Sequence, residues 1–594
     1  MAALLLAVIP ATSLNASVRV TTPDSEAAAT ADATIPTPPP KLLSGKPGPH
    51  LAWVPFSPNV RVNTPGGSPL NYQVEPTMVF NSNGKIFAGW KEAPTATAGG
   101  QRVSASYSND GGLTWARNTI MPIANGGDLQ SDPWMTVTRD DRVFFTRIEY
   151  NNFQGIAVTN TTDGVSWGTT WFYDDDPNFA DKESAAHDAA GNLYWVWNTD
   201  SSTQDLAFTR TDDGGMTFAP RLIVSDLHGT IGGIVQVAPS GTVLATWWQY
   251  STDNVMFDRS FDGGQTWGTD IRVNDIPGSA ESPLGSDPIV LPAMVVAPNG
   301  TIYITWNDYR NGRPVGSPNG NSDIMVSHSA DGGTTWSRAA KVNDDATIAP
   351  DFMPDVALDP FGVLHVAWED DRIPGQHNIY YANSTDGGQT FGPNVRVSNV
   401  GTSTSYTRPG DYLAIESSPN GTIGVVWTDG RGADLDIYFA SLPPFRYKLD
   451  TVPAGLDVQL DGITYTAPCF FNCPASATHT IGAPSPQVVG ASRYTYNSWT
   501  DGGPQNHGIT CGTTATFTAR FDTEHQVTVT TNPPNLDVIV DGLTVTAPQT
   551  YWWPRASTHI LATPSPQVYG TTRYLFRSWS DGGAQNHSVV IAAP

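Results

Sequence analysis

The chain has few cysteines, few positive charges and only a short apolar run near its start. Only 3 of its 594 residues are cysteine, which excludes a scaffold held by many disulfides. Lysine and arginine number 31 against 56 aspartates and glutamates, for a formal net charge of −25. Such a surface repels phosphate backbones, so nucleic acid is not an expected partner. The apolar run at residues 2–9 is too short to span a bilayer, and no later segment resembles a transmembrane helix.

Glycine, proline and aromatic residues are abundant instead. The chain contains 56 glycines and 48 prolines, and 10% of its residues are aromatic while only 15% are charged. This composition is typical of many short strands joined by tight turns, and it predicts an all-β protein. The start, residues 1–17, resembles a signal peptide and predicts a secreted or cell-surface protein. Residues 18–50, rich in Ala, Thr and Pro, are predicted to form a linker.

One phrase recurs seven times between residues 75 and 441. Each copy contains an apolar strand, a turn with Gly, Asn or Ser, and a second apolar strand that ends in aromatic residues. The copies are about 50–60 residues apart, which is the spacing of four-stranded propeller blades. The first strands of the copies are predicted to begin near Glu75, Asp132, Glu183, Ile231, Pro292, Pro354 and Asp411.

A second signature follows each of the first six phrases. It reads SNDGGLTW at 108–115 and SFDGGQTW at 260–267, with further copies at 161–167, 211–218, 329–336 and 384–391. These copies resemble the Asp-box, or BNR, repeat of sialidase-like β-propellers. In such a turn a hydroxyl and a carboxylate bond the backbone amides, glycine supplies positive φ, and an aromatic ring anchors the hairpin. The predicted structural residues are Asp110, Asp163, Asp213, Asp262, Asp331, Asp386, Trp115, Trp267 and Trp336.

The seventh phrase has no such signature. The segment PNVRVNT at 58–64 matches PNVRVSN at 393–399, the strand that follows the sixth signature. Residues 58–64 are therefore predicted to supply the outer strand of the seventh blade. This closure predicts a seven-bladed propeller over residues 51–443, whereas familiar sialidase domains have six blades.

Two copies of a different unit follow, offset by 80 residues. LDVQLDG at 456–462 matches LDVIVDG at 536–542, and similar pairs follow downstream. They predict two small tandem β-rich repeat domains, at 444–521 and 522–594. The first copy continues into TATFTARF at 514–521, whereas the second stops before that strand, so it is predicted to be incomplete. The first copy also holds all three cysteines, of which two are expected to pair, in a combination left open: Cys469, Cys473 and Cys511.

The loops that join successive blades, and those between the second and third strands, share one face of a propeller. The longest insertions on that face are residues 276–290, which include Glu281, and 311–321. Three corners repeat an Asp and an Arg, in WNDYR (306–310), WEDDR (368–372) and WTDGR (427–431). These groups predict either a site for an anionic sugar or structural salt bridges. The candidate ligand-binding residues are Asp308, Asp370, Asp429, Arg310, Arg372, Arg431 and Glu281.

The resemblance to sialidases implies three arginines around the substrate carboxylate, a tyrosine nucleophile helped by a glutamate, and an aspartate acid. The first blade has Val74-Glu75-Pro76 where sialidases typically have Arg-Ile-Pro. The most family-like segment is 408–413, which contains Arg408, Asp411 and Tyr412. Tyr412 needs a nearby base, for which the topology allows four residues: Glu75, Glu149, Glu183 and Glu281. The catalytic candidates are therefore Tyr412, Asp411, Arg408 and Glu75.

Two functions follow from these patterns. The missing Arg-Ile-Pro phrase and the repeated corners favour a non-catalytic propeller that binds an extracellular glycan or a surface protein. The alternative is an exo-glycosidase of sialidase type, an exo-α-sialidase acting on terminal acidic sugars. No metal site or cofactor is predicted, a structural calcium ion and the oligomeric state are left open, and fold similarity alone cannot choose between the functions.

Overall fold

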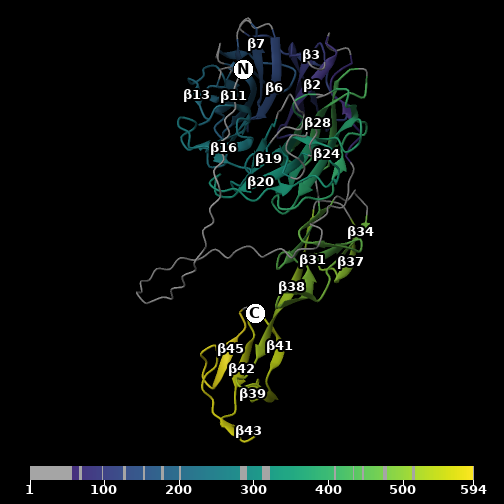
Figure 1. The fold of residues 1–594 in the computed structure, drawn as a ribbon. Coiled ribbons are helices and arrows are strands. Elements are labelled where there is room, and N and C mark those ends of the chain that lie inside the picture. The colour runs from purple at the N-terminus through teal and green to yellow at the C-terminus, as the bar shows by residue number, and fades with distance from the viewer. Residues whose placement is uncertain are drawn as a thin grey trace, which may run out of the picture. The chain divides into compact units, whose positions relative to one another are not determined.

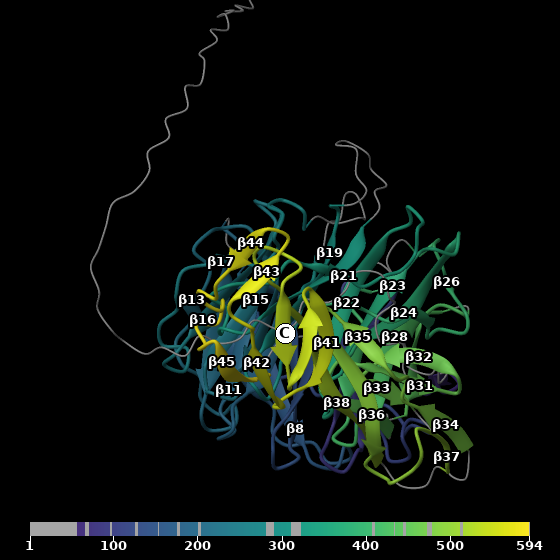
Figure 2. The same ribbon diagram turned by 90° about the horizontal axis from the view of Figure 1, so that it is seen from below.

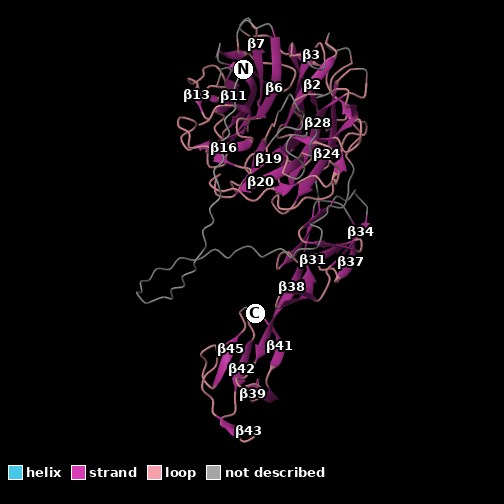
Figure 3. Cartoon of the chain, viewed as in Figure 1, coloured by secondary structure: helices cyan, strands magenta, loops and turns pink. Residues whose placement is uncertain are grey.

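The computed structural model describes residues 56–592, except 66–69, 96–97, 125–128, 152–153, 175–178, 200–202, 281–289, 311–321, 407–409, 433, 444–446, 472–477 and 511–514. The predicted signal peptide and linker, Glu281, Arg408, Cys473, Cys511 and the insertion 311–321 lie outside these residues. Every regular element that is described is a strand, which confirms the all-β class (Figure 3). In this part of the chain no helix is long and apolar enough to cross a membrane.

Residues 60–442 form seven antiparallel sheets, each with a path of four strands (Figure 1). The first three are β2 (Tyr72–Phe80), β3 (Ile86–Ala93), β4 (Arg102–Ser108), β5 (Thr119–Ile120); β6 (Leu129–Val137), β7 (Val143–Tyr150), β8 (Gly155–Thr161), β9 (Trp171–Asp174); and β10 (Phe179–His187), β11 (Leu193–Thr199), β12 (Leu206–Thr211), β13 (Leu222–Ile223).

The next four sheets follow the same order along the chain. They are β14 (Thr230–Val237), β15 (Val243–Gln249), β16 (Asn254–Ser260), β17 (Ile271–Arg272); β18 (Ala293–Val296), β19 (Ile302–Asp308), β20 (Asp323–Ser329), β21 (Ala340–Lys341); β22 (Asp351–Leu358), β23 (Leu364–Asp370), β24 (Gln376–Ser384), β25 (Val395–Arg396), with β26 (Thr402–Ser403) also on β24; and β27 (Ala414–Ser417), β28 (Ile423–Asp429), β29 (Asp436–Leu442), β1 (Val60–Arg61).

The first strands of these sheets contact one another in a closed cycle. β2 contacts β6, β6 contacts β10, and the series continues through β14, β18 and β22 to β27, which contacts β2 again. The seventh sheet takes its outer strand from the other end of this segment, because Val60 pairs with Phe439 and Arg61 with Tyr438. The predicted pairing of residues 58–64 with the third strand of the last phrase is thus confirmed. Buried apolar side chains fill the spaces between neighbouring sheets.

Five of the six box turns share one hydrogen-bond pattern, and in the shorter copy at 161–167 Asp163 accepts instead from the amides of Val165 and Ser166. In the fourth sheet, Asp262 accepts bonds from the backbone amides of Gln265 and Thr266, both at 2.9 Å. The hydroxyl of Ser260 donates to Asp262 and accepts from the amide of Gly264. A Cβ on Gly264 would lie 2.2 Å from the Phe208 ring of the preceding sheet, so the position requires glycine.

The aromatic residue of the box packs on the preceding sheet. Trp267 meets Phe208 edge-on, with ring centroids 5.1 Å apart, and Trp115 meets Phe439 of the seventh sheet at 5.4 Å. We expect Trp267→Ala to lower the free energy of unfolding by about 2–4 kcal/mol, because it removes a half-buried ring between two sheets. Denaturant unfolding measures this, with the exposed Gln265→Ala as a control within about 0.5 kcal/mol of wild type. Equal stability of the two variants would contradict the anchoring role.

The predicted strand starts are displaced in several sheets. Five first strands carry an irregularity in register, and one residue at each has positive φ: Glu75, Asp132, Lys182, Gly232 and Met353. The strands continue before these bulges, so β2 begins at Tyr72 and β10 at Phe179. The sequence phrase begins at or next to the bulge because the alternation of apolar residues is interrupted there.

Residues after 446 form further strands that belong to the two copied units. The first comprises β30 (Tyr447–Val452), β31 (Asp457–Leu460), β32 (Ile463–Thr466), β33 (Cys469–Phe471), β34 (Thr478–Gly482), β35 (Gln487–Val489), β36 (Ser492–Trp499), β37 (Asn506–Thr510) and the start of β38 (Ala515–Val529). The second comprises the end of β38, β39 (Asp537–Val540), β40 (Leu543–Thr546), β41 (Gln549–Pro554), β42 (Thr558–Ala562), β43 (Gln567–Tyr569), β44 (Thr572–Tyr574) and β45 (Asn586–Val590).

The long strand β38 belongs to both copied units. Its first half pairs with β30 and its second half with β41. β38 and β41 are seen side by side in Figure 2. Cys469 is a buried free thiol in β33, and burial raises its pKa to about 12. This thiol is therefore protonated at neutral pH.

Candidate functional site

The bulges of the first three sheets bring charged side chains together at the centre of the cycle. Glu75, Asp132 and Lys182 have φ of 56°, 46° and 57°, a conformation that side chains other than glycine rarely adopt. All three are nearly inaccessible to solvent. A bulge turns a side chain away from the direction it would have in a regular strand. The strained backbone conformation of these three residues therefore sets the position of their charged groups.

Two buried lysines hold the carboxylates of this central cluster. Lys91 Nζ lies 2.6 Å from Glu75 Oε1. Lys182 Nζ lies 3.1 Å from Asp132 Oδ2 and also bonds Asp411, which is 229 residues away in the sequence. The cluster thus joins side chains of the first, second and third sheets to the segment that leads into the seventh.

Burial and charge move the pKa values of the cluster in opposite directions. Burial raises the pKa of Glu75 to about 7, although Lys91 and Lys182 lower it. Burial also opposes the charge of Lys182, but Asp132 and Asp411 outweigh it and hold the pKa of Lys182 well above its ordinary value. Lys182, Asp132 and Asp411 therefore form a group of paired charges that is closed off from water.

A cavity of about 990 Å³ lies along the axis of the cycle and is lined by the first strands of all seven sheets. Four acidic residues line it, namely Glu183, Asp188, Asp355 and Glu416. Burial raises the pKa of Asp355 to about 6 and that of Glu416 to about 8, and it raises the pKa of Glu183 well above its ordinary value. Glu416 is consequently mostly protonated at neutral pH.

Tyr412 lines the same cavity beside the central cluster. Lys182 Nζ lies 5.1 Å from the centre of its ring. Burial raises the pKa of Tyr412 well above 10, and Asp132, Glu75, Glu183 and Asp411 raise it further. Of the predicted catalytic candidates, the structure therefore brings Tyr412, Asp411 and Glu75 together. Of the predicted bases, Glu149 instead bonds Arg147 and the backbone amide of Ala124.

The three repeated corners have a shared geometry that ties each arginine to the aspartate two residues before it. Asp308 accepts bonds from Trp306 Nε1 at 2.8 Å and from Arg310 Nη2 at 2.8 Å. Arg310 also bonds Asp275, which follows the outer strand of the preceding sheet. The other two corners repeat this pattern with Asp370 and Arg372, which reaches Asp344 and Asn394, and with Asp429 and Arg431, which reaches Asn399 and Asn59.

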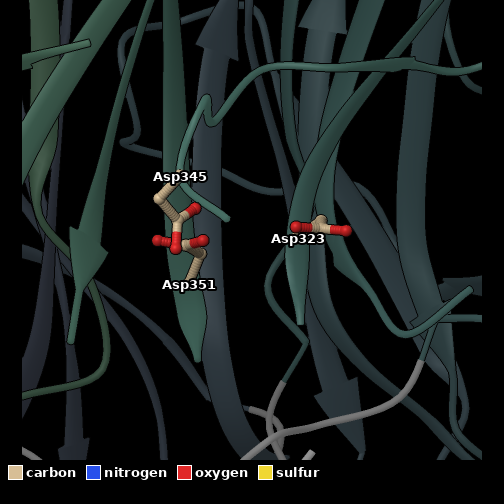
Figure 4. Close-up of side chains that lie close together, drawn as sticks. All are labelled: Asp323, Asp345 and Asp351. Carbon is tan, nitrogen blue, oxygen red and sulfur yellow. The ribbon is translucent and has the colours of Figure 1, made fainter. Parts of the chain in front are cut away.

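A group of three acidic side chains lies where one of these corners meets the neighbouring sheet. Ligand atoms of Asp323, Asp345 and Asp351 lie within 4.8 Å of one another (Figure 4). The side-chain amide of Asn343 donates to all three, at 2.9, 2.7 and 2.5 Å, while its oxygen accepts from the amide of Ile324. Lys341 also pairs with Asp323. Trp368 Nε1 also donates to Asp351, and the Thr347 hydroxyl donates to Asp345. Contacts within the protein therefore account for this group.

Arg147 is a fully buried residue of β7 that was not among the residues predicted from the sequence. The fifth residue of the second strand is a fully buried tryptophan in six sheets, and in the second sheet it is Arg147. The matching tryptophans are Trp90, Trp197, Trp247, Trp306, Trp368 and Trp427. Aligning the seven phrases residue by residue would have revealed this substitution, whereas the meeting of Lys91, Lys182 and Asp132 depends on the closed cycle.

Comparisons with known proteins identify no family. No family model and no curated protein sequence matches the chain. Among solved structures, a polysaccharide lyase described as an ulvan lyase is 12% identical, with a TM-score of 0.42, covering 64% of this chain and 96% of its own. A leech intramolecular trans-sialidase is 15% identical, with a TM-score of 0.36 and coverages of 63% and 68%. An α-L-arabinanase from Penicillium chrysogenum is 14% identical, with a TM-score of 0.37 and coverages of 65% and 98%.

Proposed function

We propose that the chain is a secreted or cell-surface, seven-bladed Asp-box propeller that binds an extracellular glycan or surface protein without catalysis. The proposed absence of catalysis rests on one observation: the three corner arginines are already bonded to other residues of the protein. Arg310, Arg372 and Arg431 each bond an aspartate of their own corner and a residue on the neighbouring blade. A clamp for a substrate carboxylate needs guanidinium groups that converge and are free to bond it.

The central cluster supports the same assignment. Its cations are Lys91 and Lys182, and both are already paired with carboxylates of the protein. The high pKa of Tyr412 opposes formation of the phenolate that would attack a sugar. In this proposal the cluster stabilises the centre of the propeller, the six Asp-boxes fasten its outer hairpins, and ligand binding belongs to loops on the face that carries the corners.

One arrangement favours the alternative, an exo-α-sialidase. Tyr412 lies close enough to Glu75 and Glu183 for both carboxyl groups to influence its pKa. A tyrosine beside a glutamate is the arrangement that the resemblance to sialidases implies for the nucleophile and its base. This alternative needs three arginines around the substrate carboxylate in addition to the tyrosine.

Assays with a fluorogenic sialoside test the choice. We expect wild type and Tyr412→Phe to give equal rates, both at the level of the buffer, because Tyr412 is not a nucleophile in the proposed function. Binding to immobilised glycans, measured in parallel, should be the same for both proteins. Tyr412→Phe removes only the phenolic oxygen, and its melting transition serves as the control for folding. Turnover by wild type that Tyr412→Phe abolishes, with melting unchanged, would establish the sialidase alternative.

A further inference from the structure

The outer edge of the fourth sheet places two aspartates opposite each other. Phe257 of β16 pairs with Ile271 of β17, so the next step of this register puts Asp258 opposite Asp270. Like charges directly opposite each other destabilise a strand pair. In the other six described sheets of the propeller, the residues at this step are Ser106 and Asn118, Thr159 and Thr170, Thr209 and Arg221, Ser327 and Ala339, Ala382 and Asn394, and Ala440 and Asn59.

Asp258 takes the place of a hydroxyl group. In four sheets the equivalent Ser or Thr donates a hydrogen bond of 2.7–3.1 Å to the carbonyl of the residue after the box aromatic. Asp258 cannot donate when it is ionised, and its Oδ1 instead accepts from the amide of Gly268 at 3.1 Å.

Two carboxylate oxygens at this step have no donor. Asp258 is 1% exposed, and its Oδ2 is buried without a hydrogen-bond partner among the described residues. The same holds for Oδ1 of Asp270, on the strand opposite. A buried carboxylate oxygen without a donor is unfavourable unless a cation approaches it. These two oxygens therefore point to a positively charged ligand.

A third carboxylate joins them from the neighbouring sheet. Asp226 follows β13, the outer strand of the third sheet. Its amide donates to Asp270 Oδ2 at 2.9 Å, and the amide of Asp270 donates to Asp226 Oδ2 at 3.0 Å. Burial raises the pKa of Asp258 to about 6 and that of Asp270 to about 7, and the charge of Asp226 adds to both shifts. Three carboxylates thus influence one another where the third and fourth sheets meet.

The equivalent junction between the fifth and sixth sheets contains an arginine. There the backbone amides of Asp344 and Asn394 each donate to the other residue's side chain, at 2.7 and 2.9 Å. Arg372, from the corner of the sixth sheet, bonds both of these side chains. The corner arginine of the seventh sheet likewise bonds an asparagine on each side of its junction. A cation from the corner is therefore part of both junctions.

The corner of the fourth sheet has a serine at this position. Arg372 stands four residues after the fully buried Trp368, and Ser251 stands four residues after the equivalent Trp247. The Ser251 hydroxyl donates to a backbone carbonyl at 2.9 Å. The junction with the most carboxylates is thus one to which its own corner brings no guanidinium group.

We propose that Asp226, Asp258 and Asp270 bind a Ca²⁺ ion between the third and fourth sheets, in the place that a corner arginine takes at the later junctions. Calcium takes six to eight oxygen ligands in a flexible geometry. The three side chains supply carboxylate oxygens, and water completes the shell on the side of Asp226, which is exposed. The ion bonds the two oxygens that have no donor and removes the repulsion between the opposed aspartates.

Calorimetric titration of the full, chelator-treated chain with CaCl₂ tests the proposal. We expect one site with a Kd below about 1 mM, and binding of Mg²⁺ at least about tenfold weaker, because Mg²⁺ gives up its water reluctantly. Asp258→Ser introduces the residue type of the other sheets and should weaken Ca²⁺ binding at least about tenfold. Asp212→Asn, which removes an exposed carboxylate outside the site, should bind as wild type does.

A second variant supplies the cation from the protein itself. Gln249→Asp with Ser251→Arg gives the fourth sheet the corner of the last three sheets. We expect this variant not to bind Ca²⁺ at the site, and its melting temperature not to change with Ca²⁺, whereas that of wild type should rise. Melting in chelator checks that each variant folds. No binding by wild type at about 10 mM Ca²⁺ would overturn the proposal, as would wild-type affinity in Asp258→Ser or in the corner variant. Equal affinity for Mg²⁺ would overturn the assignment to calcium.

Discussion

Deletion of residues 57–64 should lower the stability of the propeller by more than about 4 kcal/mol and make the chain associate with itself. Val62 is 1% exposed in a core shared with Ile437 and Phe439, and burying such a side chain contributes about 1.5–3 kcal/mol. Asn63 bonds Gln73 and Asp436 through its amide and the backbone of Ile437 through its oxygen, and each bond contributes about 1 kcal/mol. The deletion also exposes the edge of β29 to pairing with another chain.

Denaturant unfolding and sedimentation measure the two effects. Asn63→Ala is a milder variant that keeps the strand, and it should cost about 1–3 kcal/mol because it removes three buried hydrogen bonds. Pro58→Ser, at an exposed position of the same segment, should change stability by less than about 0.5 kcal/mol. A synthetic peptide of residues 56–65 should partly restore the deleted chain. An unfolding midpoint unchanged by the deletion would contradict closure of the propeller by this strand.

Lys182→Met should lower the free energy of unfolding by about 3–5 kcal/mol, because it leaves two buried carboxylates without their shared cation. Lys182, Asp132 and Asp411 are each about nine-tenths or more buried, and methionine keeps the length and the apolar contacts of the lysine stem. The positive φ of residue 182 disfavours lysine and methionine alike, so the substitution isolates the charge.

Removal of the carboxylates as well distinguishes lost charge from lost packing. The triple variant Lys182→Met, Asp132→Asn, Asp411→Asn should regain most of the stability, since no buried charge is left unpaired. Arg142→Met breaks an exposed pair with Asp140, whose side chains are 45% and 65% exposed, and should cost less than about 1 kcal/mol. If Lys182→Met is as mild as Arg142→Met, the central triad does not stabilise the fold.

Much of the architecture could be read from the sequence because its signals are local. The seven strand phrases and six box turns are each encoded within fewer than 20 residues, by apolar alternation and by Asp and Gly at turn positions. The match between residues 58–64 and 393–399 also predicted correctly that Val60 and Arg61 pair with β29. The exact strand starts could not be predicted, because the bulge at Glu75 or Lys182 interrupts the alternation that marks a strand.

The candidate site also combines features that can be read from the sequence with features that depend on the fold. The sequence by itself placed Tyr412, Asp411 and Glu75 near the first strands of the repeated phrases, and it showed that the corners repeat an Asp and an Arg. Only the tertiary structure decided that Arg310 is held by Asp308 and Asp275, and that Lys182 meets Asp411 across 229 residues. The physical reason is that pairing of charges depends on distance in space, and the closed cycle of sheets sets that distance by joining residues far apart in the chain.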